Sequence, residues 1–171
     1  MRDNELKPLG IQHAVFVAGI HAQLIILTRE KSFTIPRWVE GPTLWDKTTT
    51  SNGVSLPIRP DAFFTLAWPE GTGRAHYFVE ADRGTMAHSR MREKLQAYAA
   101  WFQQAQHLKK HPTVKMFRVV TVTETRGRAK GLEAEYRSMM PPAWLSAYPV
   151  IAIEDLTLER LMPELVAAKT A

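Results

Sequence analysis

Apolar residues recur along the chain with two periods, one typical of helices and the other typical of strands. In the first part of the chain, this pattern predicts a helix at residues 10–24, a short strand at 24–28 and another strand at 35–40. Polar, turn-forming residues at 48–53 (TTTSNG) predict a loop. The loop separates this part from a second region with a sharper pattern.

Two apolar runs in the second region predict a β-hairpin. They cover residues 61–68 and 75–82, and the sequence EGTG between them is typical of a turn. The remaining predicted elements are a helix at 86–108, a strand at 114–123, a helix at 126–138, a strand at 150–153 and a last helix near 156–168. This order of elements predicts an α/β fold with a mixed central sheet flanked by helices.

The predicted hairpin carries three carboxylates. Alternate residues of a strand share a face, so Glu80 and Asp82 are neighbours on the second strand. A turn centred between Gly71 and Thr72 places Asp61 opposite Asp82. Like charges that face each other destabilise a sheet, and a divalent cation such as Mg²⁺ or Mn²⁺ would neutralise them. Spacing alone also allows the alternative that the acids lie exposed and inert at a frayed strand end.

Charge is distributed unevenly along the chain, which holds 22 Lys and Arg against 17 Asp and Glu. Residues 83–137 contain twelve bases and four acids. A basic flank of this kind suits a DNA backbone, and an ordinary solvated surface is the alternative. The bases expected to contact DNA are Arg83, Arg90, Arg126, Arg128 and Lys130. The absence of cysteine excludes a disulfide framework, a thiolate zinc site and a cysteine nucleophile.

The N-terminal part predicts a cytoplasmic protein with no membrane partner. Residues 8–28 are uncharged and have the length of a membrane span, but they include two histidines, two glutamines and two glycines. This composition favours a buried amphipathic helix, and the first ten residues lack the pattern of a secretory signal. Further along, His107 and His111 have a spacing that could bind zinc, but an exposed helix end is the more ordinary interpretation.

Three segments carry motifs whose order is typical of a known family: RPDAFF at 59–64, YFVEADRGT at 77–85 and REKLQAYAAWF at 92–102. A Pro-Asp strand, an E-x-D strand and a K-x-x-x-Y helix follow one another in this way. The chain thereby resembles the replication-relaxation family, the nuclease-like domain of plasmid mobilisation proteins and MOB-C type relaxases. That family is related to PD-(D/E)XK nucleases of the restriction-endonuclease kind. The resemblance implies a single nuclease-like domain over 1–171, with a core at about 10–125 and a C-terminal extension at about 126–171.

The resemblance also implies a site. Asp61, Glu80 and Asp82 would bind Mg²⁺ or Mn²⁺, although Asp82 stands where the nuclease superfamily has a lysine. Lys94 on the following helix could supply the missing positive charge. Tyr98 could bind a phosphate, but it lies on the apolar stripe of that helix, which favours core packing. His13 could reach the site as an accessory group, and a satisfied core histidine is the favoured alternative.

The leading hypothesis is a metal-dependent DNA endonuclease or nickase of a plasmid or mobile-element replication-relaxation system. Its partners would be DNA at an origin, other relaxosome or replication proteins, and a second copy of the chain if it oligomerises. The alternative is a catalytically degenerate, nuclease-fold module that binds DNA in a replication or mobilisation complex. A third, weaker hypothesis is a domain whose basic face binds an acidic protein.

Overall fold

A mixed five-stranded sheet divides the molecule into two layers of helices. The computed structural model describes residues 8–71 and 73–163. The strands lie in the order β1 (Thr34–Glu40), β4 (Ala62–Ala67), β5 (Arg74–Asp82), β6 (Arg118–Thr123) and β7 (Val150–Ala152). The first three strands are antiparallel, whereas β6 and β7 run parallel to β5. The predicted α/β fold with a mixed sheet and flanking helices is therefore confirmed.

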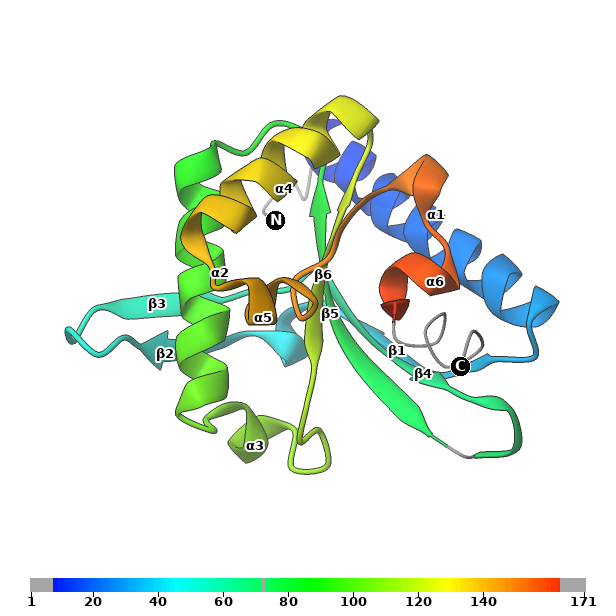
Figure 1. Cartoon of the computed structure of the whole chain (residues 1–171), viewed down its shortest axis with the longest axis horizontal. Coiled ribbons are helices and arrows are strands. Elements are labelled where there is room, and N and C mark those ends of the chain that lie inside the picture. The colour runs from blue at the N-terminus through cyan, green and yellow to red at the C-terminus, as the bar shows by residue number, and fades with distance from the viewer. Residues whose placement is uncertain (1–7, 72, 164–171) are drawn as a thin grey trace, which may run out of the picture.

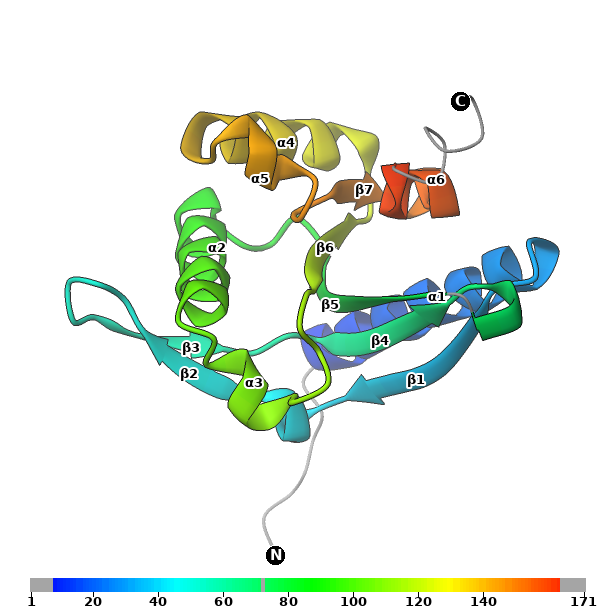
Figure 2. The same ribbon diagram turned by 60° about the horizontal axis from the view of Figure 1, so that its bottom comes forward.

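Helices cover both faces of this sheet (Figures 1 and 2). α1 (Pro8–Glu30) and α6 (Leu158–Leu161) pack on one face, and α2 (His88–Gln103) and α4 (Arg126–Met139) lie on the other. The short helices α3 (His107–Lys110) and α5 (Pro142–Leu145) join these layers to the strands. A separate hairpin, β2 (Asp46–Thr49) and β3 (Ser55–Ile58), packs against α2.

Strand β5 shows how the sequence builds two cores from one sheet. Tyr77 and Val79 point into the core beneath α1 and α6, whereas Phe78 points into the core beneath α2. The same alternation carries Glu80 and Asp82 toward the α2 side, where both side chains are buried. Two acids in a buried position need compensating partners, and this need shapes the site described below.

Two predicted elements are wrong, one in its type and one in its end. The strand predicted at 24–28 is the last part of α1, because Leu24 and Thr28 continue the buried helical stripe of Val17 and Ile20. The helix predicted at 86–108 ends at Gln103, since Ala105 adopts a positive φ of 52° and α3 then starts separately.

Three further predictions fail only in their bounds. Part of the loop predicted at 48–53 belongs to β2, the strand predicted from residue 114 begins at Arg118, and α6 is shorter than the helix predicted near 156–168. Residues 164–168 of that prediction lie outside the described part of the chain. The elements at 35–40, 61–68, 75–82 and 126–138 are confirmed to within a residue or two.

Helix α1 is less buried than its predicted role as a buried amphipathic helix requires. Its stripe through Val17 and Ile20 packs on the sheet, but Ile11, Val15 and Ile26 remain about half or more exposed. Among the described helices, α1 alone is long and apolar enough to cross a membrane, a test that core helices of soluble proteins also pass.

His107 and His111 lie in an aromatic cluster rather than at an exposed helix end, so the prediction of an exposed end is wrong. Both side chains are buried beside Trp101, and the ring of His111 stacks on Phe63 at 5.5 Å between centroids. The Nε2 atom of each histidine is buried without a hydrogen-bond partner. Burial lowers the pKa of His111 to about 4, so this side chain is neutral in the folded protein at neutral pH.

His111 should therefore make the fold sensitive to acid. Below about pH 6.5 the unfolded chain binds a proton at His111 that the folded protein does not bind until about pH 4, so stability falls across this window. We expect the variant His111→Phe to lose less free energy of unfolding between pH 7 and 4 than the wild type does. Urea denaturation at each pH measures the difference, with His88→Phe, on the half-exposed surface of α2, as the control. Parallel pH profiles for the wild type and His111→Phe would contradict this role.

Candidate functional site at the ends of β4 and β5

Asp61 and Glu80 face each other where β4 begins and β5 ends. Ala62 pairs with Val79, so Asp61, one residue earlier, lies opposite Glu80, and its backbone N–H donates to Val79 at 2.9 Å. The predicted pairing of Asp61 with Asp82 is wrong by two residues. The shift arises because the strand ladder closes at Trp68 and Gly73, which centres the turn one residue earlier than expected. Alternate residues of a strand share a face, so a shift of two residues leaves Asp61 on the same face of the sheet as Glu80 and Asp82.

Glu80 receives two partners from α2. The ammonium group of Lys94 forms an ion pair with Oε2, and the hydroxyl of Tyr98 donates to Oε1 at 2.7 Å. Lys94 and Tyr98 are four residues apart, so one face of α2 delivers both groups. Burial raises the pKa of Glu80, and the nearby charge of Asp61 adds to this effect, while Lys94 and Tyr98 act against it. Tyr98 is buried as predicted, and its hydroxyl also has this specific partner.

Lys94 lies in the field of all three acids. Burial lowers its pKa, but the charge and hydrogen bond of Glu80, followed by the charges of Asp61 and Asp82, raise it above the usual value. The lysine is therefore charged at neutral pH. Its side chain is 26% exposed, whereas the side chain of Glu80 is 3% exposed. The structure thus places a cation from α2 beside the carboxylates. The nuclease superfamily has its lysine on the strand, where this chain has Asp82.

Asp61 is anchored by two different groups. Its Oδ2 accepts a hydrogen bond from the backbone N–H of Ala81 at 2.7 Å, and its Oδ1 lies 2.8 Å from Nε2 of His13 on α1. The side chain of His13 is 40% exposed, so the favoured interpretation of a core histidine is wrong. The hydrogen bond to Asp61 raises the pKa of His13, an effect that burial, Lys94 and Arg83 partly oppose. His13 thereby gives Asp61 a titratable partner at the accessible side of the site.

Asp82 has a different set of contacts. Its Oδ2 accepts a hydrogen bond from Nε of Arg128 at 2.6 Å, and its Oδ1 accepts one from the backbone N–H of Gly84 at 3.0 Å. Arg128 also donates to the carbonyl of Met86 at 2.6 Å. Within residues 8–71 and 73–163, no three acidic or histidine side chains form a group that could hold a metal ion. The structure therefore brings Asp61 and Glu80 together and directs Asp82 toward α4.

The bases predicted to contact DNA fall into two groups. Arg83 donates to Glu124 and to Gln12, both at 2.8 Å, and Arg128 is committed to Asp82. In contrast, Arg90 and Lys130 are exposed, and neither has an acidic partner within the described part of the chain. Their side chains are free to contact a polyanion.

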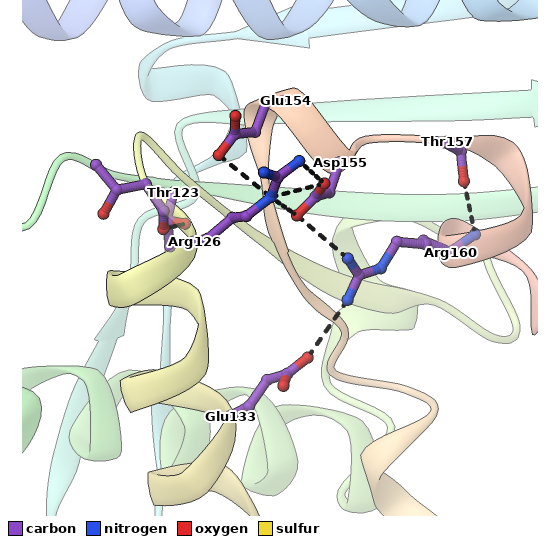
Figure 3. Close-up of polar contacts among 8 residues, drawn as sticks. Thr123, Arg126, Glu133, Glu154, Asp155, Thr157 and Arg160 are labelled. Atoms are coloured by element: carbon purple, nitrogen blue, oxygen red, sulfur yellow. Dashed lines mark hydrogen bonds and ion pairs between the residues drawn. The ribbon is translucent and has the colours of Figure 1, made fainter.

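Arg126 belongs to a surface network that joins α4 to the C-terminal segment (Figure 3). Its guanidinium donates from both Nε and Nη2 to Asp155, with the shortest distance 2.7 Å, and Nε lies 3.4 Å from Glu154. Arg160 extends the network to Asp155 at 3.6 Å and to Glu133 at 3.7 Å. The hydrogen bond with Arg126 lowers the pKa of Asp155. These ion pairs hold the parts of residues 126–163 together, and strand β7 pairs with β6 to join this segment to the central sheet.

The partner of Asp82, Arg128, is a functional residue whose role the sequence does not predict. The sequence predicts Arg128 as a base of the DNA-binding flank from its charge alone, whereas the structure pairs it with Asp82. The signal that could have found its role is the strand pattern itself, since an acid at an inward position of a buried strand requires a cation from a neighbouring element.

No curated protein and no solved structure matches the chain. The family model described as replication-relaxation matches residues 2–117, which is more than half of the chain and includes Asp61, Glu80, Asp82 and Lys94. The chain therefore belongs to the replication-relaxation family.

Proposed function

We propose that this chain is a metal-dependent DNA endonuclease or nickase that acts in the cytoplasm on a plasmid or other mobile element. Membership of the replication-relaxation family indicates a role in plasmid or mobile-element replication or mobilisation, with DNA and replication proteins as partners. The observation that carries the finer proposal is the pair Asp61 and Glu80 on adjacent strands, with the ammonium group of Lys94 bound to the second acid.

The residues at this pair fit a divalent cation. Mg²⁺ in enzymes that act on phosphates is bound by one or two carboxylates, and waters and substrate phosphate complete its shell. Asp61 and Glu80 supply two carboxylates, and the side chain of Asp61 is 21% exposed. Asp82 as a third ligand stays a prediction, because that role requires its release from Arg128. Bound Mg²⁺ or Mn²⁺ would polarise a phosphodiester and lower the pKa of an attacking water.

The protein side chains would each have a defined role. Lys94, charged and near all three acids, would stabilise negative charge that develops on the phosphate oxygens. His13 would hold the orientation of Asp61 through their hydrogen bond. Arg90 and Lys130, both exposed, would bind the DNA backbone in a salt-dependent manner. The order of a Pro-Asp strand, an E-x-D strand and a helix bearing Lys94 and Tyr98 supports a PD-(D/E)XK core of the MOB-C type.

Removing either member of the acid pair should abolish cleavage. We expect Asp61→Asn and Glu80→Gln to lower the rate of Mn²⁺-dependent nicking of supercoiled plasmid by about 100-fold or more, because each removes a metal ligand. Gel shift in EDTA should show unchanged DNA affinity, since neither acid contributes favourably to phosphate binding. Glu30→Gln, an exposed acid at the end of α1 and outside the site, is the control and should cleave normally. Equal nicking by the wild type and both site variants would refute the assignment.

One observation favours a second candidate, a catalytically degenerate module that binds DNA. Both oxygens of Glu80 and both oxygens of Asp82 already have hydrogen-bond partners, and Lys94 and Arg128 neutralise these two charges. Such a module would show no divalent-dependent cleavage. Its DNA affinity would fall steeply with salt and would depend on exposed bases such as Lys130. The nicking assay with purified wild-type protein separates the two candidates.

A further inference from the structure

A pocket of about 280 Å³ adjoins the candidate site and is not explained by the carboxylates. It lies between the β2–β3 hairpin and the first turns of α2, and Lys94 belongs both to its lining and to the ion pair with Glu80. The pocket therefore opens next to the place where a scissile phosphate would be bound. Its volume is close to the lower limit of about 300 Å³ for small-molecule pockets, so it suits a small, compact group.

The lining combines apolar and cationic side chains. Leu56 and Pro57 of β3 and Met86 before α2 supply the apolar surface. Arg59, Arg90 and Lys94 supply three positive charges, and Glu93 is the only acid that lines this pocket. Apolar surface together with positive charges matches a nucleotide, which presents a flat base and a phosphate at once.

Arg59 is positioned to contact a base. Its guanidinium carbon lies 5.2 Å from the ring centroid of Trp45, a cation–π contact in which the indole supports one side of the side chain. Planar guanidinium groups also stack on bases, so Arg59 could lie between Trp45 and a base in the pocket. Arg59 is exposed, and no acid in the described part of the chain pairs with it. It also directly precedes Pro60 and Asp61, which links the pocket to the first acid of the site.

We propose that this pocket binds one unpaired nucleotide of a DNA strand, next to the phosphate that the site acts on. The inference rests on the proposed function, because it takes the substrate to be DNA. A base inside a duplex cannot enter a concave pocket, whereas an unstacked base can place its face against the apolar side chains of the lining. The preferred substrate is then single-stranded DNA or a duplex with an unpaired segment.

Binding in EDTA tests the inference without cleavage. Fluorescence anisotropy would compare an oligothymidylate, an abasic strand of equal length and a matched duplex. Leu56→Trp fills the pocket and leaves its cations in place, and Arg59→Ala removes one cation that supports the base. Both variants should bind oligothymidylate about tenfold more weakly than wild type, while abasic and duplex affinities change by less than about twofold. Lys115→Ala, an exposed base in the loop before β6, is the control and should have little effect.

The outcomes separate this inference from the proposed function. If wild type binds all three nucleic acids and the pocket variants lose affinity for each equally, the pocket contacts only phosphates and the inference is wrong. If the variants bind like wild type, the inference is also wrong, but the proposed function stands. If no DNA binds, both fail. If polyglutamate competes with DNA for the protein, and Arg59→Ala weakens the binding of polyglutamate, the pocket binds an acidic protein instead.

Thermal melting of Leu56→Trp and Arg59→Ala must show an intact fold. If one variant is unstable, the other alone decides the result.

Discussion

Replacing Arg128 with methionine is expected to lower the free energy of unfolding by about 3–5 kcal/mol, the range found when one partner of a buried ion pair is removed. Nε of Arg128 lies 2.6 Å from Oδ2 of Asp82, and the two side chains are 17% and 2% exposed. Without the guanidinium, the backbone N–H of Gly84 is the one hydrogen-bond donor to Asp82 that remains among the described residues. A buried carboxylate in that state either keeps an uncompensated charge or binds a proton, and both cost stability.

Urea denaturation at pH 7 measures this effect. The double variant Asp82→Asn with Arg128→Met should recover much of the loss, because it removes the stranded charge as well as its partner. Lys130→Met, an exposed base two residues further along α4, is the matched control and should change stability by no more than about 0.5 kcal/mol. If Arg128→Met is as stable as the wild type, Asp82 does not depend on Arg128, and its assignment as a third metal ligand gains support.

The sequence could predict the parts of the fold that depend on local patterns. The hairpin of β4 and β5 has two apolar runs and a turn between them, and both strands form where expected. Its register could not be predicted from the turn residues alone, since the EGTG run allows more than one turn centre and the structure selects the one that the hydrogen bond from Trp68 to Gly73 closes. The wrong register does not change which acids share a face, because a shift of two residues keeps Asp61 on the face of the sheet that carries Glu80 and Asp82.

The parts that failed depend on contacts between distant elements. The run Leu24–Thr28 has strand-like composition, and only the packing of α1 on the sheet makes it helical. The hairpin of β2 and β3 is stabilised against α2, so nothing in its own polar sequence predicts two strands. His107 and His111 look like an exposed helix end because of the adjacent lysines, yet the aromatic core encloses both rings.

The candidate site also has one part that the sequence predicts and one part that it does not. The types and order of Asp61, Glu80, Lys94 and Tyr98 were readable, since their spacing places them on a strand and on one helix face. The pairing of each cation with its acid could not be predicted, because α2 and α4 both carry bases toward the same strand. The structure pairs Lys94 with Glu80 and Arg128 with Asp82. This pairing leaves Asp61, with His13, as the most accessible acid of the three.

Replacing Lys94 with methionine should shift metal binding to higher pH. Burial already raises the pKa of Glu80, and the charge of Lys94 opposes this effect. Without the ammonium group the pKa of Glu80 should rise further, so a metal must compete with a proton for this acid up to a higher pH. We expect the midpoint of the pH dependence of Mg²⁺-induced thermal stabilisation to move upward by at least about one unit relative to wild type.

Thermal melting from pH 6 to 9, with and without Mg²⁺, measures this shift. A metal that binds only the folded state at about 100 times its Kd adds roughly 2.7 kcal/mol, which is readily seen as a higher melting temperature. Lys94→Arg retains a cation and should keep the midpoint near that of wild type. Asp61→Asn should show little response at any pH. If Mg²⁺ stabilises Lys94→Met with the wild-type pH profile, Lys94 does not control the protonation of Glu80 at the metal site.

In Lys94→Met, nicking activity should not recover together with metal binding. At alkaline pH, where Lys94→Met binds Mg²⁺ again, nicking should remain about 10²–10³-fold slower than in wild type, because no ammonium group stabilises charge on the phosphate. Lys94 would then have two separable effects: it keeps Glu80 ionised for the metal, and it acts on the phosphate directly. Full recovery of nicking at alkaline pH would leave only the first of these effects, and Lys94 would be a positioning residue for Glu80.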